Sequence, residues 1–115
     1  MIVGAAAVEI RIHGSSSLKE KRGVVRSISR RVRNRFNVAV AEVEGQDTWQ
    51  RAVLGFAAAG ADARVVRGVL ERAVSFVEDM HLAEVLHSEI EILQLPYAAG
   101  EDDGSDAEPG PRDEE

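Results

Sequence analysis

The 115-residue chain has no cysteine and only five aromatic side chains. The absence of cysteine excludes a disulfide framework, a thiolate nucleophile and a zinc site with cysteine ligands, and it favours a cytoplasmic setting. The chain also has no run of about eighteen apolar residues, which a membrane-spanning helix would need. Its N-terminal segment has no basic region and is interrupted by Glu9 and Arg11. We therefore expect neither a membrane span nor a signal peptide.

Positive charge is concentrated in residues 16–36, within a chain whose net charge is −6. This segment has one acid, Glu20, and eight basic residues: Lys19, Lys21, Arg22, Arg26, Arg30, Arg31, Arg33 and Arg35. Its net charge is therefore +7. Residues 98–115 hold eight acids and one base, Arg112, which gives −7. Residues 1–97 are then close to neutral overall, with one strongly basic element.

Hydrophobic periodicity divides the chain into six elements. Alternation and β-branched runs predict strands over residues 2–13, 37–44, 48–59 and 83–95. Apolar spacings of three and four predict helices over residues 18–36 and 62–80. Ser17 with Glu20 forms a capping box for the first helix, and Asp62 is a good N-cap for the second.

The resulting order, β-α-β-β-α-β, predicts one α+β domain over residues 1–97 with a ferredoxin-like fold. Two helices should cover one face of a four-stranded antiparallel sheet whose central strands are the first and the third. Residues 98–115 are rich in acid, Gly and Pro, so we expect an acidic disordered tail. The uncovered sheet face should be polar and should meet water or a partner. The residues expected on it include Glu9, Arg11, Trp49, Arg51, His87, Glu89 and Glu91.

Several segments resemble the YlxP-like family, a small bacterial domain of unknown function (DUF503). The matching stretches are SLKEKR at residues 17–22, RFNV at 35–38, AEV at 41–43 and AVLG at 52–55. The resemblance covers about residues 1–95 and implies a ferredoxin-like fold in a cytoplasmic bacterial protein. Genes of this family often lie among those for translation initiation factor two and ribosome-binding factor A, which suggests a role near RNA or the ribosome. No catalytic residues are established for the family, so none is carried over.

The first predicted helix places several cations on one flank. Arg22, Arg26, Arg30 and Arg33 fall within roughly 80° of one another, and Lys19 extends the line to about 20 Å. Planar guanidinium groups bind phosphate bidentately, so this helix is predicted to bind the backbone of RNA or of a ribosomal subunit. The predicted RNA-binding residues are Lys19, Lys21, Arg22, Arg26, Arg30 and Arg33. Alternatively, these cations pair with acids such as Glu42, Glu44 or Glu71, or are simply solvated.

The sheet argues against base recognition of the kind an RRM uses, because RRM strands stack bases on aromatic side chains. The first predicted strand has no aromatic residue, and the third has Trp49 and Phe56 on opposite faces. A G-x-x-G clamp is absent as well, so RNA contact should be directed to the backbone. Trp49 could stack a base, or it could pack at the edge of the core.

Catalytic patterns are weak, and we predict a non-enzymatic protein without a cofactor. Ser16 and Lys19 match S-x-x-K, but capping explains the serines and no second hydrolase motif accompanies them. The three histidines lack metal-ligand spacing, and we predict no metal site. The acids Glu42, Glu44 and Asp47 could hold Mg²⁺ bound to RNA, although such acids more often belong to a solvated loop.

A second functional class is a protein-interaction or ligand-binding module that forms a homodimer through its open sheet face. In that case Trp49 and Arg51 would be the sensitive residues. The acidic tail adds a further hypothesis, because at −7 it could fold back on the +7 helix and compete with RNA.

Overall fold

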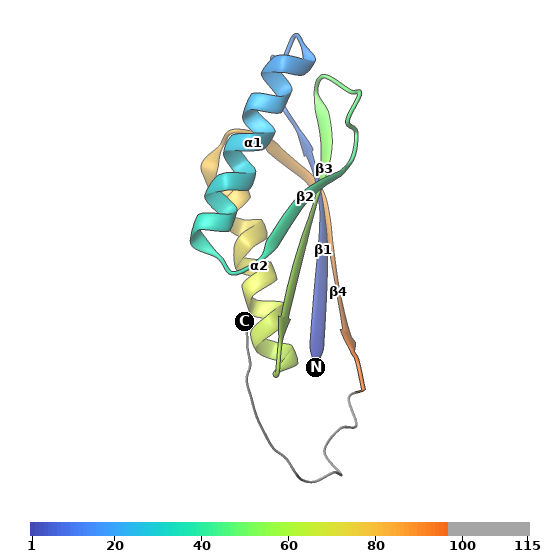
Figure 1. Cartoon of the computed structure of the whole chain (residues 1–115). Coiled ribbons are helices and arrows are strands. Elements are labelled where there is room, and N and C mark those ends of the chain that lie inside the picture. Colours follow the sequence, from blue (N-terminus) through green and yellow to red (C-terminus); the bar gives the residue numbers. More distant parts are fainter. Residues whose placement is uncertain (97–115) are drawn as a thin grey trace, which may run out of the picture.

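The computed structural model describes residues 1–96 and shows a four-stranded antiparallel sheet with two helices on one face (Figure 1). Its elements are β1 (Ile2–Arg11), α1 (Leu18–Arg35), β2 (Ala39–Glu44), β3 (Arg51–Gly60), α2 (Ala63–Met80) and β4 (Glu84–Gln94). The strand order is β2-β3-β1-β4, which confirms the predicted ferredoxin-like arrangement with the first and third strands at the centre. The predicted tail, residues 98–115, lies outside the described residues. No helix in the described range has the length and apolarity needed to cross a membrane.

Both helices begin at side-chain caps that the sequence predicts. Ser17 Oγ accepts a hydrogen bond from the Glu20 backbone N–H at 3.1 Å, and Glu20 Oε1 accepts one from the Ser16 backbone N–H at 2.8 Å. At the start of α2, Asp62 Oδ1 accepts bonds from the N–H groups of Arg64 and Val65. These bonds satisfy amides that have no partner within the helix.

The core lies between the sheet and the two helices. It contains alternate residues of the central strands, namely Ala6, Val8, Ile10, Ala52, Leu54 and Phe56, together with Val25, Ile28 and Val32 of α1 and Val66, Leu70, Ala73, Val74 and Val77 of α2. Helix α2 packs on β1, β3 and β4, whereas α1 packs on β2 and α2. Gly4 permits the close approach of α2 to β1, because a Cβ atom there would lie 2.7 Å from Leu70 Cδ1 and from Val66 Cγ1.

The structure differs from the predicted strands at one turn and at one bulge. β3 begins at Arg51 and not at residue 48, because residues 45–50 form a turn in which Gly45 has φ +87° and its carbonyl accepts a bond from the Thr48 N–H. In β4, the register shifts between the pairs Glu9↔His87 and Ile10↔Val85. Leu86 is therefore the extra residue of a β-bulge, which interrupts the alternation predicted over residues 83–95, and its side chain is exposed.

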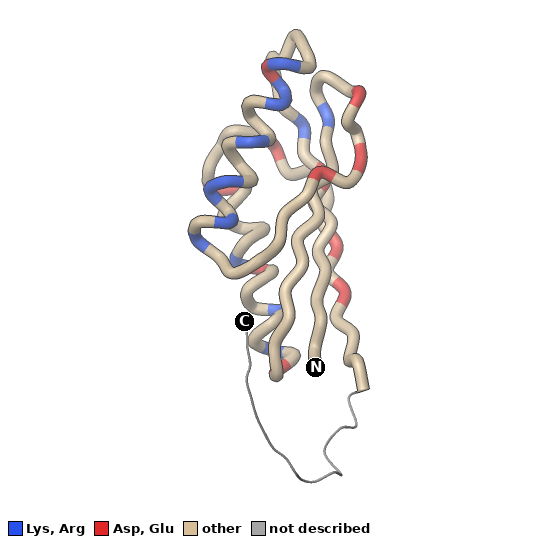
Figure 2. Tube along the Cα trace, in the orientation of Figure 1, with Lys and Arg blue, Asp and Glu red and all other residues tan. Residues whose placement is uncertain are grey.

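The prediction of a polar open sheet face is correct only at one end and along one edge. Figure 2 shows charged positions at the end where β3 begins and along β4, with uncharged strands between them. The central pairs on this face are Val3↔Ala59, Ala5↔Ala57 and Ala7↔Gly55. Glu9, Arg11 and Arg51 follow only at the far end of the same face. The centre of this sheet face, on β1 and β3, is therefore made of small apolar residues.

Candidate nucleic-acid interface on the first helix

Helix α1 carries an exposed basic stripe, which we define as Lys19, Arg22, Arg26, Arg30 and Arg33. All five residues are exposed. On a regular helix the stripe spans roughly 80°, about 120° away from the buried row of Val25, Ile28 and Val32. It extends about 20 Å along the helix axis. Figure 2 shows the basic positions following one another along α1. The structure therefore presents five of the six predicted RNA-binding residues on one solvent-facing surface.

The cations of the basic stripe have no acidic partner within residues 1–96. Every ion pair in this range involves Lys21, Arg51, His13 or His87, and none involves the stripe. Of the acids expected as partners, Glu42 contacts Lys21 and Glu44 lies 3.9 Å from Arg51. The alternative that the stripe is neutralised within the fold is therefore wrong for the described part of the chain.

Lys21 is the exception, and its assignment to the RNA-binding surface is wrong. Its side chain is 0% exposed, its Nζ lies 2.8 Å from Glu42 Oε2, and it donates a hydrogen bond to the Gly45 carbonyl. Lys21 lies four residues before Val25 and seven before Ile28, which places it in the buried row of the helix. That spacing is the signal in the sequence that identifies Lys21 as an internal residue.

Hydrogen bonds hold the turn between β2 and β3 beside the start of α1. Lys21 bonds to Gly45 at one end of the turn, and at the other end Gln50 Nε2 donates to the Ser15 carbonyl at 3.1 Å. Figure 1 shows this turn and the first turn of α1 at the same end of the molecule. Trp49, within the turn, is 53% exposed, so about half of its surface faces solvent, and both of its predicted roles stay predictions.

Arg51 differs from Trp49, although the sequence groups the two as one interaction surface. Its Nε donates to Glu9 Oε2 at 2.6 Å, and its Nη2 lies 3.9 Å from Glu44 Oε1. The Glu9 carboxylate raises the pKa of Arg51 through this hydrogen bond and through its charge. Arg51 is thus held in an ion pair at the end of the open sheet face, whereas Trp49 projects from the turn.

Arg35 and Arg31 are outside the basic stripe. The Arg35 guanidinium lies 5.1 Å from the centre of the Phe76 ring on α2, which fits a cation–π contact. Phe76 also meets Phe36 edge to face at 5.6 Å. Arg35 therefore helps to join the two helices, and Arg31 is exposed but lies about 100° from the nearest member of the stripe.

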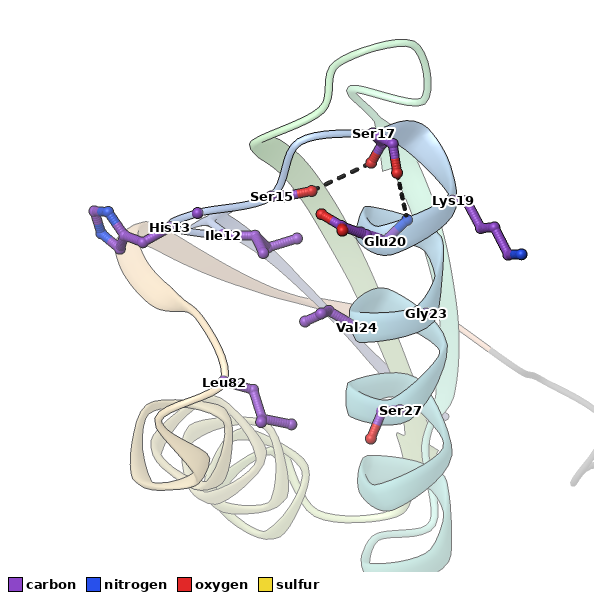
Figure 3. A pocket seen from close by; sticks show the side chains of 11 residues that line it. Ile12, His13, Ser15, Ser17, Lys19, Glu20, Gly23, Val24, Ser27 and Leu82 are labelled. Carbon is purple, nitrogen blue, oxygen red and sulfur yellow. Dashed lines mark hydrogen bonds between the residues drawn. The ribbon is translucent and has the colours of Figure 1, made fainter.

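An open groove of about 860 Å³ lies beside the first half of α1. Figure 3 shows Ile12, Val24 and Leu82 turned toward it, with Lys19 and His13 pointing away. Ser16 Oγ donates to Glu20 and not to Lys19, so the S-x-x-K match forms no serine–lysine pair. Among residues 1–96, no group of three or more His, Asp and Glu side chains is placed to hold a metal ion.

Comparison with known proteins gives a family but no activity. The family model described as "Protein of unknown function (DUF503)" matches residues 3–90. The "Uncharacterized protein YlxP" of Bacillus subtilis (strain 168) is 40% identical over 77 residues, which cover 67% of this chain and 84% of the relative. These matches confirm the family resemblance seen in the sequence. The solved structure "De novo designed protein Foldit4" matches 83% of this chain and 98% of its own, with 13% sequence identity and a TM-score of 0.47.

Proposed function

Because the chain belongs to the DUF503 family, which is described as a family of unknown function, we propose a function from its geometry. The protein is a non-enzymatic factor that binds the phosphate backbone of RNA through the basic stripe of α1. The observation that supports this proposal is a row of five exposed cations without an acidic partner within residues 1–96. Such a row suits a polyanion, since guanidinium groups bind phosphate oxygens in pairs.

The electrostatic repulsion within the basic stripe also favours a bound ligand. Arg22, Arg26 and Arg30 follow one another at intervals of four residues. Like charges at this spacing destabilise a helix by a few tenths of a kcal/mol per pair. A helix that only has to remain in solution avoids this cost by mixing charges of both signs. A bound phosphate backbone removes the repulsion and releases counterions as well.

The recognition that we propose reads the RNA backbone and its shape, with little dependence on base sequence. The sheet presents no aromatic platform, because Phe56 is only 1% exposed and β1 has no aromatic residue. Modules that stack bases on a sheet require such side chains. Ribosomal RNA within an assembled subunit is the first target to test, because the family resemblance suggests a role near the ribosome.

The test compares two triple variants with the same change in net charge. Arg22, Arg26 and Arg30 become Glu in one variant, and the exposed Arg64, Arg67 and Arg72 of α2 become Glu in the other. Cosedimentation with purified small and large ribosomal subunits and anisotropy with a structured RNA are measured across a salt series, after circular dichroism has verified both folds. We expect the α1 variant to lose at least about 100-fold in affinity and the log–log salt slope to fall by about 3.

The α2 variant should keep its affinity within a few-fold. Equal losses in the two variants would show that net charge alone matters and that α1 is no specific surface. If the wild-type protein binds neither RNA nor either subunit at low salt, the proposal is wrong.

A further inference from the structure

The open face of the sheet is apolar over its central area. Three successive rows cross β3 and β1 as Ala59 and Val3, Ala57 and Ala5, and Gly55 and Ala7. Strand β2 extends two of these rows with Ala39, opposite Ala57, and Ala41, opposite Gly55. At the two edges, Val43 is 51% exposed and Leu93 is 56% exposed.

This composition differs from that of a solvated sheet face. An antiparallel sheet with one face in water normally alternates apolar and polar residues along each strand. From residues 2 to 8, β1 is apolar on both faces, and from residues 52 to 60 so is β3. Strands of this kind are typical of sheets that are covered on both sides. Both helices lie on the other face, so within residues 1–96 no element of the chain itself covers this one.

We infer that two copies of this chain pack face to face through their open sheet faces. The resulting dimer places both α1 helices at its outer surfaces, where their basic stripes remain exposed. This inference does not depend on RNA binding. It goes beyond that function by assigning a role to the side of the molecule that α1 does not use.

The size of the face is sufficient for a dimer at the lower end of the stable range. The strands β1, β2, β3 and β4 have 10, 6, 10 and 11 residues. With strands about 4.8 Å apart and about 3.3 Å per residue, the whole face, including its charged margins, covers roughly 600 Å². Two such faces bury roughly 1,200 Å² in total, and specific interfaces begin near this value. The face thus has the area for specific self-association, and the dimer should be moderate in affinity.

The shape and the charge of the face favour a second copy as the occupant. Alanine and glycine give the face low relief, so it is complementary to itself, as a twofold interface requires. Val43 rises above it by packing over Gly55, where a Cβ atom would lie 3.0 Å from Val43 Cγ1. The charged groups are at the margins: Glu89 and Glu91 on the edge strand, and the paired Glu9 and Arg51 at one end. An apolar centre with a charged rim is the usual anatomy of a protein interface.

The test places one carboxylate on the face and a matched one elsewhere. Ala57→Glu places the carboxylate at the centre of the face. The control, Val65→Glu, places it on α2 at an apolar residue that is 62% exposed. Sedimentation equilibrium is run on the full chain up to about 100 µM, a range that detects moderate affinities. We expect the wild type and Val65→Glu to form dimers, and Ala57→Glu to raise the dissociation constant by at least about 100-fold, because symmetry buries two unpaired charges.

Ala41→Glu, on the same face of β2, repeats the test if Ala57→Glu does not fold. A wild-type protein that stays monomeric at about 100 µM would overturn the inference. A dimer that survives both face variants would also overturn it and would indicate pairing along the β4 edge. The triple variant Arg22→Glu, Arg26→Glu and Arg30→Glu should remain dimeric, which separates this inference from the proposed RNA function.

Discussion

The two helices of this domain have the same length and cover the same sheet face, but they use their residues differently. Each has 18 residues. Helix α2 buries five apolar side chains and carries three basic and three acidic residues. Helix α1 buries only three apolar side chains, and it exposes seven basic residues and one acid, Glu20. A helix on this sheet face can therefore pack with balanced charge. The exposed cations of α1 form no ion pair within residues 1–96, which supports a role in binding.

The cations of α1 also differ among themselves, because one of them is buried. Lys21 is fully buried against Glu42, whereas Arg26 is exposed and has no acidic partner in the described range. If this difference is correct, substitutions of Lys21 and of Arg26 should have very different effects on the free energy of unfolding. Replacing each with methionine keeps an unbranched chain of similar length while removing the positive charge.

We expect Lys21→Met to lower the free energy of unfolding by about 3 kcal/mol, because it leaves the Glu42 carboxylate without its buried partner. Arg26→Met should change it by less than about 0.5 kcal/mol. Urea unfolding followed by circular dichroism measures both. The double variant Lys21→Met with Glu42→Leu should recover part of the loss, since no uncompensated charge remains. Equal stabilities of the two single variants would contradict the division of α1 into an internal and an exposed set of cations.

Glycine gives a second way to compare the helices. A Cβ atom at Gly23 of α1 would meet nothing within 4 Å, whereas one at Gly68 of α2 would lie 3.2 Å from Arg72 Nη1. We expect Gly23→Ala to stabilise the protein by up to about 1 kcal/mol, because alanine forms helix more readily. In a domain of this size the unfolding temperature should rise by roughly 4–8 °C.

Gly68→Ala should give a smaller increase, because the Arg72 side chain has to move. Differential scanning calorimetry measures the unfolding temperatures of the two variants and shows which increase is larger. If Gly23→Ala is destabilising, the space beside the first half of α1 is filled in solution, and the open groove there is not free.

The sequence predicts most of this fold because periodicity and capping are local signals. The alternating strands, the two apolar helix stripes and the caps at Ser17 and Asp62 all appear where the pattern indicates them. The bulge at Leu86 is missed because an extra residue in a strand changes which face its neighbours occupy without changing composition. The start of β3 is missed because Thr48 and Trp49 are residue types that favour strands, although both lie in the turn that begins at Gly45.

The candidate site is predicted less completely because a formal charge does not reveal burial. Five cations of α1 are exposed as expected, but Lys21 is recognised as internal only from its spacing to Val25 and Ile28. The open sheet face is mispredicted for a related reason. Alanine is compatible with either side of a sheet, so the row that contains Ala5 and Ala57 carries no clear signal until the strand register is known.

The smallest predicted effect concerns Glu20, the one acid of α1. Bonds from the Ser16 backbone N–H and hydroxyl lower the pKa of Glu20 below its ordinary value of 4.5. A carboxylate with a lowered pKa in the folded state stabilises the protein above its ordinary pKa, and this contribution disappears as the pH falls through the folded value. Glu20→Gln keeps an acceptor for the Ser16 N–H and removes only the charge.

The unfolding temperature of the wild type should therefore exceed that of Glu20→Gln by a constant amount between about pH 5 and pH 7, and the difference should shrink below about pH 4.5. Other titrating groups are common to both proteins, so they cancel in the difference. A gap that stays constant down to about pH 3 would mean that the charge of Glu20 does not contribute. In that case neutral hydrogen bonds alone cap α1, and the negative charge of Glu20 has no part in balancing the seven exposed cations of this helix.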